Sequence, residues 1–85
     1  MKYRYVVLGS GRQGVALGYD QAKSGEGARV VMVDSDAKVA ERAVERLRRL
    51  LPDSQCALEA RACDVTRTSD AMGVMRGADV ALSAV

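Results

Sequence analysis

The sequence predicts an α/β fold of the three-layer type, with helices on both faces of a parallel four-stranded sheet. Three observations carry this prediction. Short apolar segments alternate with segments whose apolar residues recur at helical spacing, the connections are short, and a glycine-rich loop follows the first apolar segment. Such alternation is typical of a sheet whose strands are joined by crossover helices.

Four segments have the composition of strands. Residues 3–8 and 28–33 are rich in Val and Tyr and stop at a glycine or an aspartate, so both are expected to be largely buried. Residues 57–63 alternate between apolar and charged side chains, which favours an edge strand with one wetter face. Residues 79–85 form the last strand. Right-handed crossovers then give the spatial order 3-2-1-4.

Two longer helices are expected between these strands. Residues 12–24 form the first and end at a glycine-containing turn. The second begins at Ser35 or Asp36, either of which can cap it, and runs to about Leu51 before a proline. Its apolar positions keep the 3.6-residue period of a helix with one buried face.

A third, short helix is expected over residues 66–76. Met72 and Met75 are predicted to face the sheet, and Gly77 is predicted to end the helix. Three hydroxyl residues are candidate N-caps: Thr66, Thr68 and Ser69.

Composition limits what the chain can do. Its 85 residues hold one small domain at most, and 48% hydrophobic with 28% charged residues is ordinary globular composition. A net charge of +2 is too weak to predict nucleic-acid binding, and the absence of His excludes a His base or metal ligand. With no secretory signal and no long apolar run, a cytoplasmic protein without membrane segments is expected.

Cysteine content argues against a metal site. Cys56 and Cys63 are the only cysteines, and a zinc site needs more ligands than two cysteines without His. They are predicted to be small apolar side chains in or near a strand.

The loop after the first strand carries the functional signal. Residues 9–14 read Gly-Ser-Gly-Arg-Gln-Gly, and Asp34 ends the second strand twenty residues after Gly14. Strand, glycine loop, helix and acidic residue together form the Rossmann dinucleotide fingerprint. Gly9 allows the tight turn, Gly11 lets the backbone approach a pyrophosphate, and Gly14 lets the helix pack closely on the sheet.

A dinucleotide would meet further residues at the ends of the strands. The helix N-terminus attracts phosphates, and Arg12 and Gln13 lie in its first turn. Asp34 is expected to accept hydrogen bonds from the ribose hydroxyls and to repel a 2′-phosphate, which favours NAD(H) over NADP(H). A plain helix cap is the competing interpretation of Asp34. The remaining candidate cofactor contacts are Ser10, Ser35, Asp64, Val65 and Ser83. A turn into the next helix, capped by Asp64 or Thr66, is the competing interpretation of residues 64–66.

A family resemblance rests on four segments: residues 6–14, 33–34, 64–66 and 78–85. They resemble the N-terminal cofactor domain of saccharopine dehydrogenase-like proteins, lysine 6-dehydrogenases among them. The resemblance implies NAD(P)-dependent oxidation of an amine in an amino-acid-type substrate. It also implies a C-terminal domain with the catalytic residues, so these residues alone are not expected to turn over substrate.

Two other classes of protein share parts of this pattern. Regulatory nucleotide-binding modules of the kind that gate potassium transport use a strand, a Gly-x-Gly-Arg loop and a ribose-binding acid without catalysis. Methyltransferases that bind S-adenosylmethionine have a third glycine where Gln13 stands. The length fits a fragment of a doubly wound fold, and self-association through the edge of the last strand is expected.

Overall fold

Seven elements succeed one another in the predicted order. The computed structural model describes residues 3–23, 27–64 and 67–84. The elements are β1 (Tyr3–Leu8), α1 (Arg12–Lys23), β2 (Gly27–Asp34), α2 (Ala37–Leu50), β3 (Ala57–Ala62), α3 (Thr68–Met75) and β4 (Val80–Ser83). No helix in the described part of the chain has the length and apolar character needed to span a membrane.

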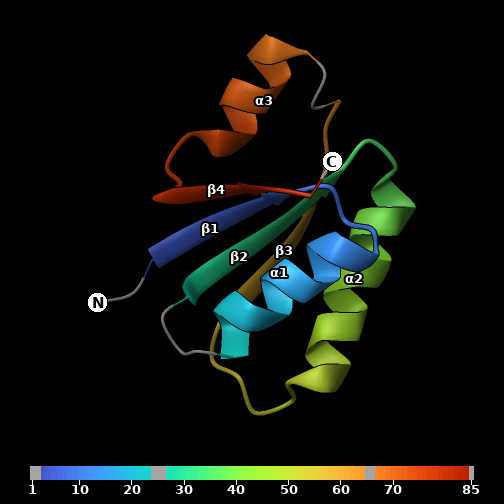
Figure 1. Ribbon diagram of the computed structural model, residues 1–85, viewed down its shortest axis with the longest axis vertical. Helices are drawn as coiled ribbons and strands as arrows, with labels where there is room; N and C mark the ends of the chain where they lie inside the picture. The colour runs from blue at the N-terminus through green and yellow to red at the C-terminus, as the bar shows by residue number, and fades with distance from the viewer. Residues whose placement is uncertain (1–2, 24–26, 65–66, 85) are drawn as a thin grey trace.

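The four strands form one parallel sheet in the order β3-β2-β1-β4, which confirms the predicted topology. β1 lies between β2 and β4, and β3 lies at the far edge beyond β2. Because all strands run the same way, their carboxyl ends meet at one edge of the sheet (Figure 1). The loops that the sequence singles out for cofactor binding all leave from this edge.

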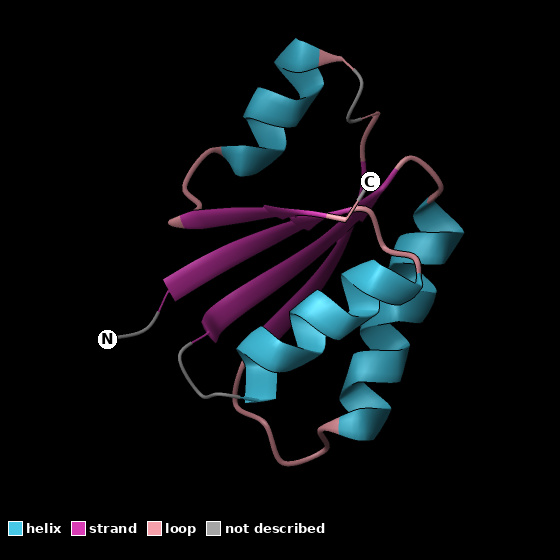
Figure 2. Cartoon of the chain, in the orientation of Figure 1, coloured by secondary structure: helices cyan, strands magenta, loops and turns pink. Residues whose placement is uncertain are grey.

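Helices cover both faces of the sheet, α1 and α2 on one and α3 on the other (Figure 2). The strand residues alternate between two cores accordingly. Val7 and Met32 belong to the larger core beneath α1 and α2, whereas Val6 and Val33 belong to a smaller core that includes Val74 of α3. This alternation is the period of two expected of strands buried on both faces.

The long helix α2 supplies much of the larger core. Leu47 is fully buried, and its neighbours on the same helix face, Ala40, Ala43 and Val44, are also buried. Asp36 caps this helix, because its carboxylate accepts a hydrogen bond from the Lys38 backbone N–H at 2.9 Å. Of the two candidate caps, Asp36 is therefore the one used.

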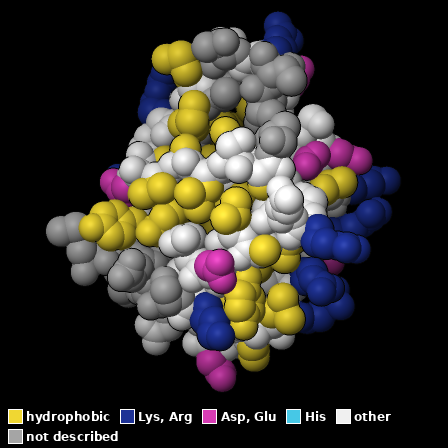
Figure 3. Space-filling view, viewed as in Figure 1, with side chains coloured by type: hydrophobic (Ala, Val, Ile, Leu, Met, Phe, Trp, Pro, Cys, Tyr) yellow, Lys and Arg dark blue, Asp and Glu magenta, His cyan; other side chains and the backbone are white. Residues whose placement is uncertain are grey.

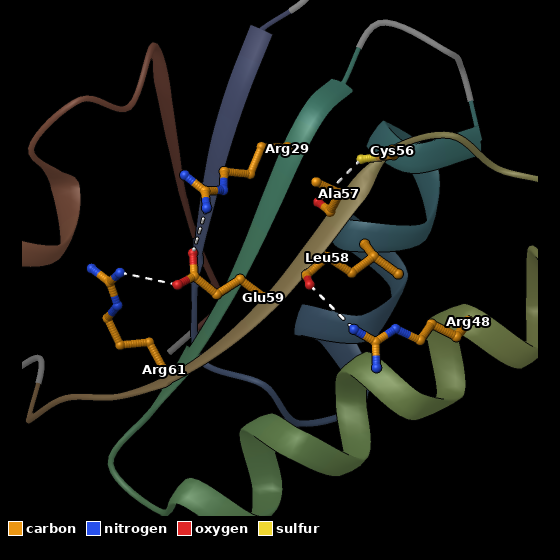
Figure 4. Close-up of polar contacts among 7 residues, drawn as sticks. All are labelled: Arg29, Arg48, Cys56, Ala57, Leu58, Glu59 and Arg61. Atoms are coloured by element: carbon orange, nitrogen blue, oxygen red, sulfur yellow. Dashed lines mark hydrogen bonds and ion pairs between the residues drawn. The ribbon is translucent and has the colours of Figure 1, made fainter.

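β3 has the charged face that its sequence predicts. On one side Glu59 pairs with Arg29 at 3.5 Å and with Arg61 at 3.2 Å. On the other side Leu58 packs against the larger core, and the Arg48 side chain of α2 donates to its carbonyl at 3.5 Å (Figure 4). Exposed ion pairs of this kind contribute little stability, at most about 1 kcal/mol.

Of the two α3 residues predicted to face the sheet, Met75 does so and Met72 does not. Met72 is 61% exposed, and Val74 is the buried residue instead. This short helix reaches the smaller core through Val74 and Met75 at its C-terminal end, which leaves Met72 facing solvent.

The cap of α3 also differs from expectation. Arg67 occupies the N-cap position without a side-chain cap hydrogen bond, so neither Thr68 nor Ser69 caps the helix. Thr66 lies outside the described residues. Gly77 ends the helix as predicted, with a φ of 83° in a turn closed by a 3.0 Å bond from the Ala78 N–H to the Met75 carbonyl.

Both cysteines are half-buried beside strand β3, and neither forms a disulfide. Cys56 packs against the larger core and Cys63 against the smaller one, in agreement with their expected role as small apolar side chains.

Candidate functional site

The glycine loop is fixed to the end of β2. Gly9 adopts a φ of 97°, a conformation that favours glycine, and its N–H donates to the Val33 carbonyl at 2.7 Å. The Ser10 hydroxyl, which is buried, donates to the same carbonyl at 2.9 Å. The sequence signals Ser10 only as a loop position, so its role as a tether between loop and strand was missed.

The last glycine of the motif allows α1 to begin directly against the loop. A Cβ added to Gly14 would overlap the carbonyl oxygen of Gly9 and lie 2.8 Å from its carbonyl carbon. One turn later, a Cβ on Gly18 would lie 2.9 Å from the Met32 sulfur. Close packing of α1 against backbone therefore requires glycine at position 14, as the fingerprint predicts, whereas at position 18 the contact is with the flexible end of the Met32 side chain.

Gly11 has a different environment. A Cβ added there would meet no protein atom within 4 Å. Packing within the protein therefore does not require glycine at this position, and the open space lies at the start of α1. This is the arrangement expected where a ligand approaches the backbone closely.

The N-terminus of α1 faces the same open space. The Gly11 carbonyl accepts the first helical bond, from the Val15 N–H at 3.0 Å. The N–H groups of a helix's first turn have no acceptors within the helix, and the helix dipole makes this end positive. Arg12 and Gln13 are exposed in this turn, so backbone donors and one cation are available to an anion.

Asp34 links the glycine loop to the turn after β2. Its Oδ2 accepts the Ser10 N–H at 3.1 Å, and its Oδ1 accepts the Asp36 N–H at 3.0 Å. These two bonds hold the half-buried carboxylate beside the loop. A carboxylate offers about four lone-pair sites, so acceptor capacity remains for a ligand. Because Asp36 caps α2, a plain helix cap does not explain Asp34.

An open cavity of about 590 Å³ lies between helix α3, the end of β3 and Ser35, the residue that follows Asp34. Ser35, Cys63 and Asp64 line its strand side, and Ser69 and Gly73 line its helix side. Sequence reasoning identified Ser35 and Asp64 but missed the α3 residues. The small side chains of the Thr68–Met75 helix were the only available signal.

Two expected contacts remain to be placed. Ser83 is exposed at the carboxyl end of β4, opposite Leu8, and the next residue, Ala84, donates to the Leu8 carbonyl at 2.8 Å. It therefore shares the sheet edge with the glycine loop. Val65 lies outside the described residues.

Comparisons with known proteins identify the fold. No protein-family model matches the chain, and no curated protein matches it. The ligand-free 5-ketofructose reductase of Gluconobacter sp. strain CHM43 is 21% identical with a TM-score of 0.69, over 98% of this chain and 27% of that one. A metagenomic short-chain oxidoreductase in complex with NADP is 22% identical with a TM-score of 0.68, over 95% of this chain and 38% of that one. The chain thus spans well under half the length of either protein and has the Rossmann-like fold.

Proposed function

We propose that this chain binds NAD(H) and forms the cofactor-binding part of an oxidoreductase. The observation that carries the proposal is the hydrogen bond between Ser10 and Asp34, which joins the glycine loop and the ribose-binding acid into one site. The open space at Gly11 and the α1 N-terminus beside it suit a pyrophosphate. These donors and this acceptor match the polar groups of a dinucleotide.

NAD(H) is the proposed form of the cofactor because of the charges around the ribose site. The Asp34 carboxylate would accept hydrogen bonds from the ribose hydroxyls and repel a 2′-phosphate. The next residues are Ser35 and Asp36, which add a second negative charge and no cation. Lys38 and Arg42 lie further along α2. As cations they favour NADP(H), but only weakly.

The remaining contacts are proposed from the cavity beside α3 and from places in the sequence. We assign the adenine to this cavity, with Ser35 and Asp64 at its polar rim. Val65 is proposed as an apolar contact from its place in the sequence, and Ser83 as a small residue near the pyrophosphate. When bound, NAD supplies a hydride acceptor.

The substrate class is inferred from the resemblance to saccharopine dehydrogenase-like proteins. It implies oxidation of an amine in an amino-acid-type substrate, with catalytic residues supplied by a further domain. The two similar structures are both oxidoreductases, and the chain covers only 27% and 38% of them. Hydride transfer is accordingly proposed for a larger assembly, and dinucleotide binding for these residues.

Calorimetric titration of the purified chain with NAD and NADP tests the cofactor. Tighter binding of NAD is expected, and Asp34→Asn should weaken it by about 10- to 100-fold, the worth of hydrogen bonds to a charged group. Asp53→Asn makes the same charge change at an exposed position in the turn after α2 and should leave affinity unchanged. Tighter binding of NADP, or equal effects of the two variants, would contradict the proposal.

The two cysteines provide a second test within one molecule. Cys63 lines the proposed adenine cavity, whereas Cys56 lies at the opposite end of β3. Bound NAD should slow alkylation of Cys63 by iodoacetamide and leave the rate at Cys56 unchanged, as followed by mass spectrometry. Equal protection of both thiols would indicate a global effect and not occupancy of the cavity.

A regulatory nucleotide-binding module is the alternative function. The observation that favours it is Arg12 directly after Gly11, at the exposed start of α1. ATP binding as tight as NAD binding in the same titration would support this alternative. Tighter binding of S-adenosylmethionine than of either would support a methyltransferase.

A further inference from the structure

A second hollow lies between α1 and α2, along the outer side of this helix layer. Its volume is about 690 Å³, within the range of small-molecule sites. One end adjoins Ser10 and Gly11, and the other reaches Tyr19 and Leu50. We call this hollow the interhelical groove.

The walls of the interhelical groove are largely apolar. Val15, Ala16 and Tyr19 of α1 face Val39 and Ala43 of α2 across it. Leu50, at the end of α2, is 48% exposed and is one of two large apolar side chains in the described chain with such exposure. Figure 3 shows apolar surface over these helices, with Lys and Arg side chains beside it.

The rim of the groove is cationic. Arg12, Arg42 and Arg46 line it, against a single acidic residue, Asp20. None of these three guanidinium groups forms an ion pair with a residue that the structure describes. Arg42 and Arg46 stand one helical turn apart, where like charges repel and destabilise a helix. An anion placed between them would relieve that repulsion.

We propose that the interhelical groove binds a small anionic amphiphile, a carboxylate with an aliphatic or aromatic body. The apolar body would cover the walls and exposed Leu50, and the carboxylate would pair with Arg42 and Arg46. Apolar burial supplies the affinity and the guanidinium groups select the sign of charge. This proposal does not depend on NAD binding, because the apolar walls and Arg46 lie outside the proposed cofactor site.

Titration of the ¹⁵N-labelled chain with octanoate, followed by amide chemical shifts, tests the proposal. Octanoate should shift amides along α1 and α2, including Tyr19 and Ala43. Acetate, which lacks the apolar body, and octylammonium, which reverses the charge, should bind about tenfold more weakly or not at all. Octylammonium binding as tight as octanoate binding would overturn the proposal.

Two charge reversals on the same helix provide matched variants. Arg46→Glu should weaken octanoate binding about fivefold, as expected for one exposed ion pair. Arg49→Glu makes the same change three residues later, at an exposed position that does not line the groove, and should alter binding less than twofold. Equal weakening by both variants would show a general charge effect and overturn the assignment.

Leu50→Ser tests the apolar half of the site. It should weaken octanoate binding while the amide spectrum keeps the dispersion of the folded chain, because Leu50 is half exposed. Unchanged octanoate affinity in this variant would argue against burial of the apolar body in the groove. The octanoate titration is repeated with saturating NAD, so that octanoate binding in the groove is measured separately from binding at the proposed cofactor site.

Discussion

Gly14→Ala should destabilise the fold, whereas Gly11→Ala should leave stability nearly unchanged and remove dinucleotide binding. A Cβ at position 14 would overlap the Gly9 carbonyl oxygen and lie 2.8 Å from its carbon. Both atoms belong to the backbone, so no side-chain rotation relieves the overlap. At position 11 a Cβ meets nothing within 4 Å, so it would collide only with a bound ligand.

The magnitude follows from two opposing effects. Overpacking typically costs about 1–3 kcal/mol, and a backbone contact puts Gly14→Ala near 3 kcal/mol. The better helix propensity of alanine offsets about 1 kcal/mol of this. The net loss of about 2 kcal/mol corresponds to a decrease in Tm of about 8–16 °C for a domain of this size.

Gly11→Ala has smaller and compensating effects on stability. Gly11 precedes α1 as its N-cap, where glycine is preferred over alanine. Alanine in turn restricts the unfolded chain, which stabilises by about 0.4–1 kcal/mol. A change in Tm within about 4 °C is therefore expected.

Thermal unfolding followed by circular dichroism, together with calorimetric titration with NAD, separates the two effects. Gly14→Ala should lower Tm, and Gly11→Ala should keep Tm while its NAD affinity falls. A Gly14→Ala protein that unfolds at the unchanged temperature would refute the packing argument. A Gly11→Ala protein with undiminished NAD affinity would refute the assignment of this space to the pyrophosphate.

Three further predictions concern the core, the α2 cap and the edge of the sheet. Leu47→Ala should cost about 2–5 kcal/mol in urea unfolding, because Leu47 is fully buried, and Leu50→Ala less than about 1 kcal/mol; equal losses would contradict the burial pattern. Asp36→Ala should lower the free energy of unfolding by about 1 kcal/mol in the same measurement, and Asp36→Asn should lower it much less. Equal losses in the two variants would contradict capping of α2 by Asp36. We also propose that chains associate through β4, which lies at one edge of the sheet. Light scattering should show association at high concentration, and Ala81→Lys should reduce it. A clean monomer of the unsubstituted chain would refute this proposal.

The parts of the fold that the sequence predicts well depend on local patterns. Strand-like segments that alternate with helix-like segments indicate the element order, and the right-handedness of crossover connections indicates the strand order β3-β2-β1-β4. The expected ends of the elements lie within a few residues of the observed ones. For example, β4 is predicted over residues 79–85 and is observed over Val80–Ser83. Pairing with β1 sets the length of this strand, and composition alone does not indicate it.

The parts that it does not predict depend on contacts between distant residues. Met72 and Val74 are both apolar, and an eight-residue helix leaves too few turns to define a buried face. The interhelical groove was missed for a similar reason. The arginines of α2 indicate only a solvated helix face until α1 is placed beside them.

The turn after β2 shows how the structure changes the meaning of a sequence motif. Asp34 and Asp36 are both acidic residues just before a helix, so local sequence permits either to be its cap. The structure assigns the cap to Asp36, whose carboxylate accepts the Lys38 N–H, whereas the Asp34 carboxylate accepts the N–H of Ser10 in the glycine loop. Capping thus involves Asp36 and the next helix, while Asp34 is oriented by the glycine loop itself. A ligand that contacts Asp34 therefore meets a carboxylate whose position depends on the loop that would hold its phosphates, which is a physical reason for the two motifs to act as one site.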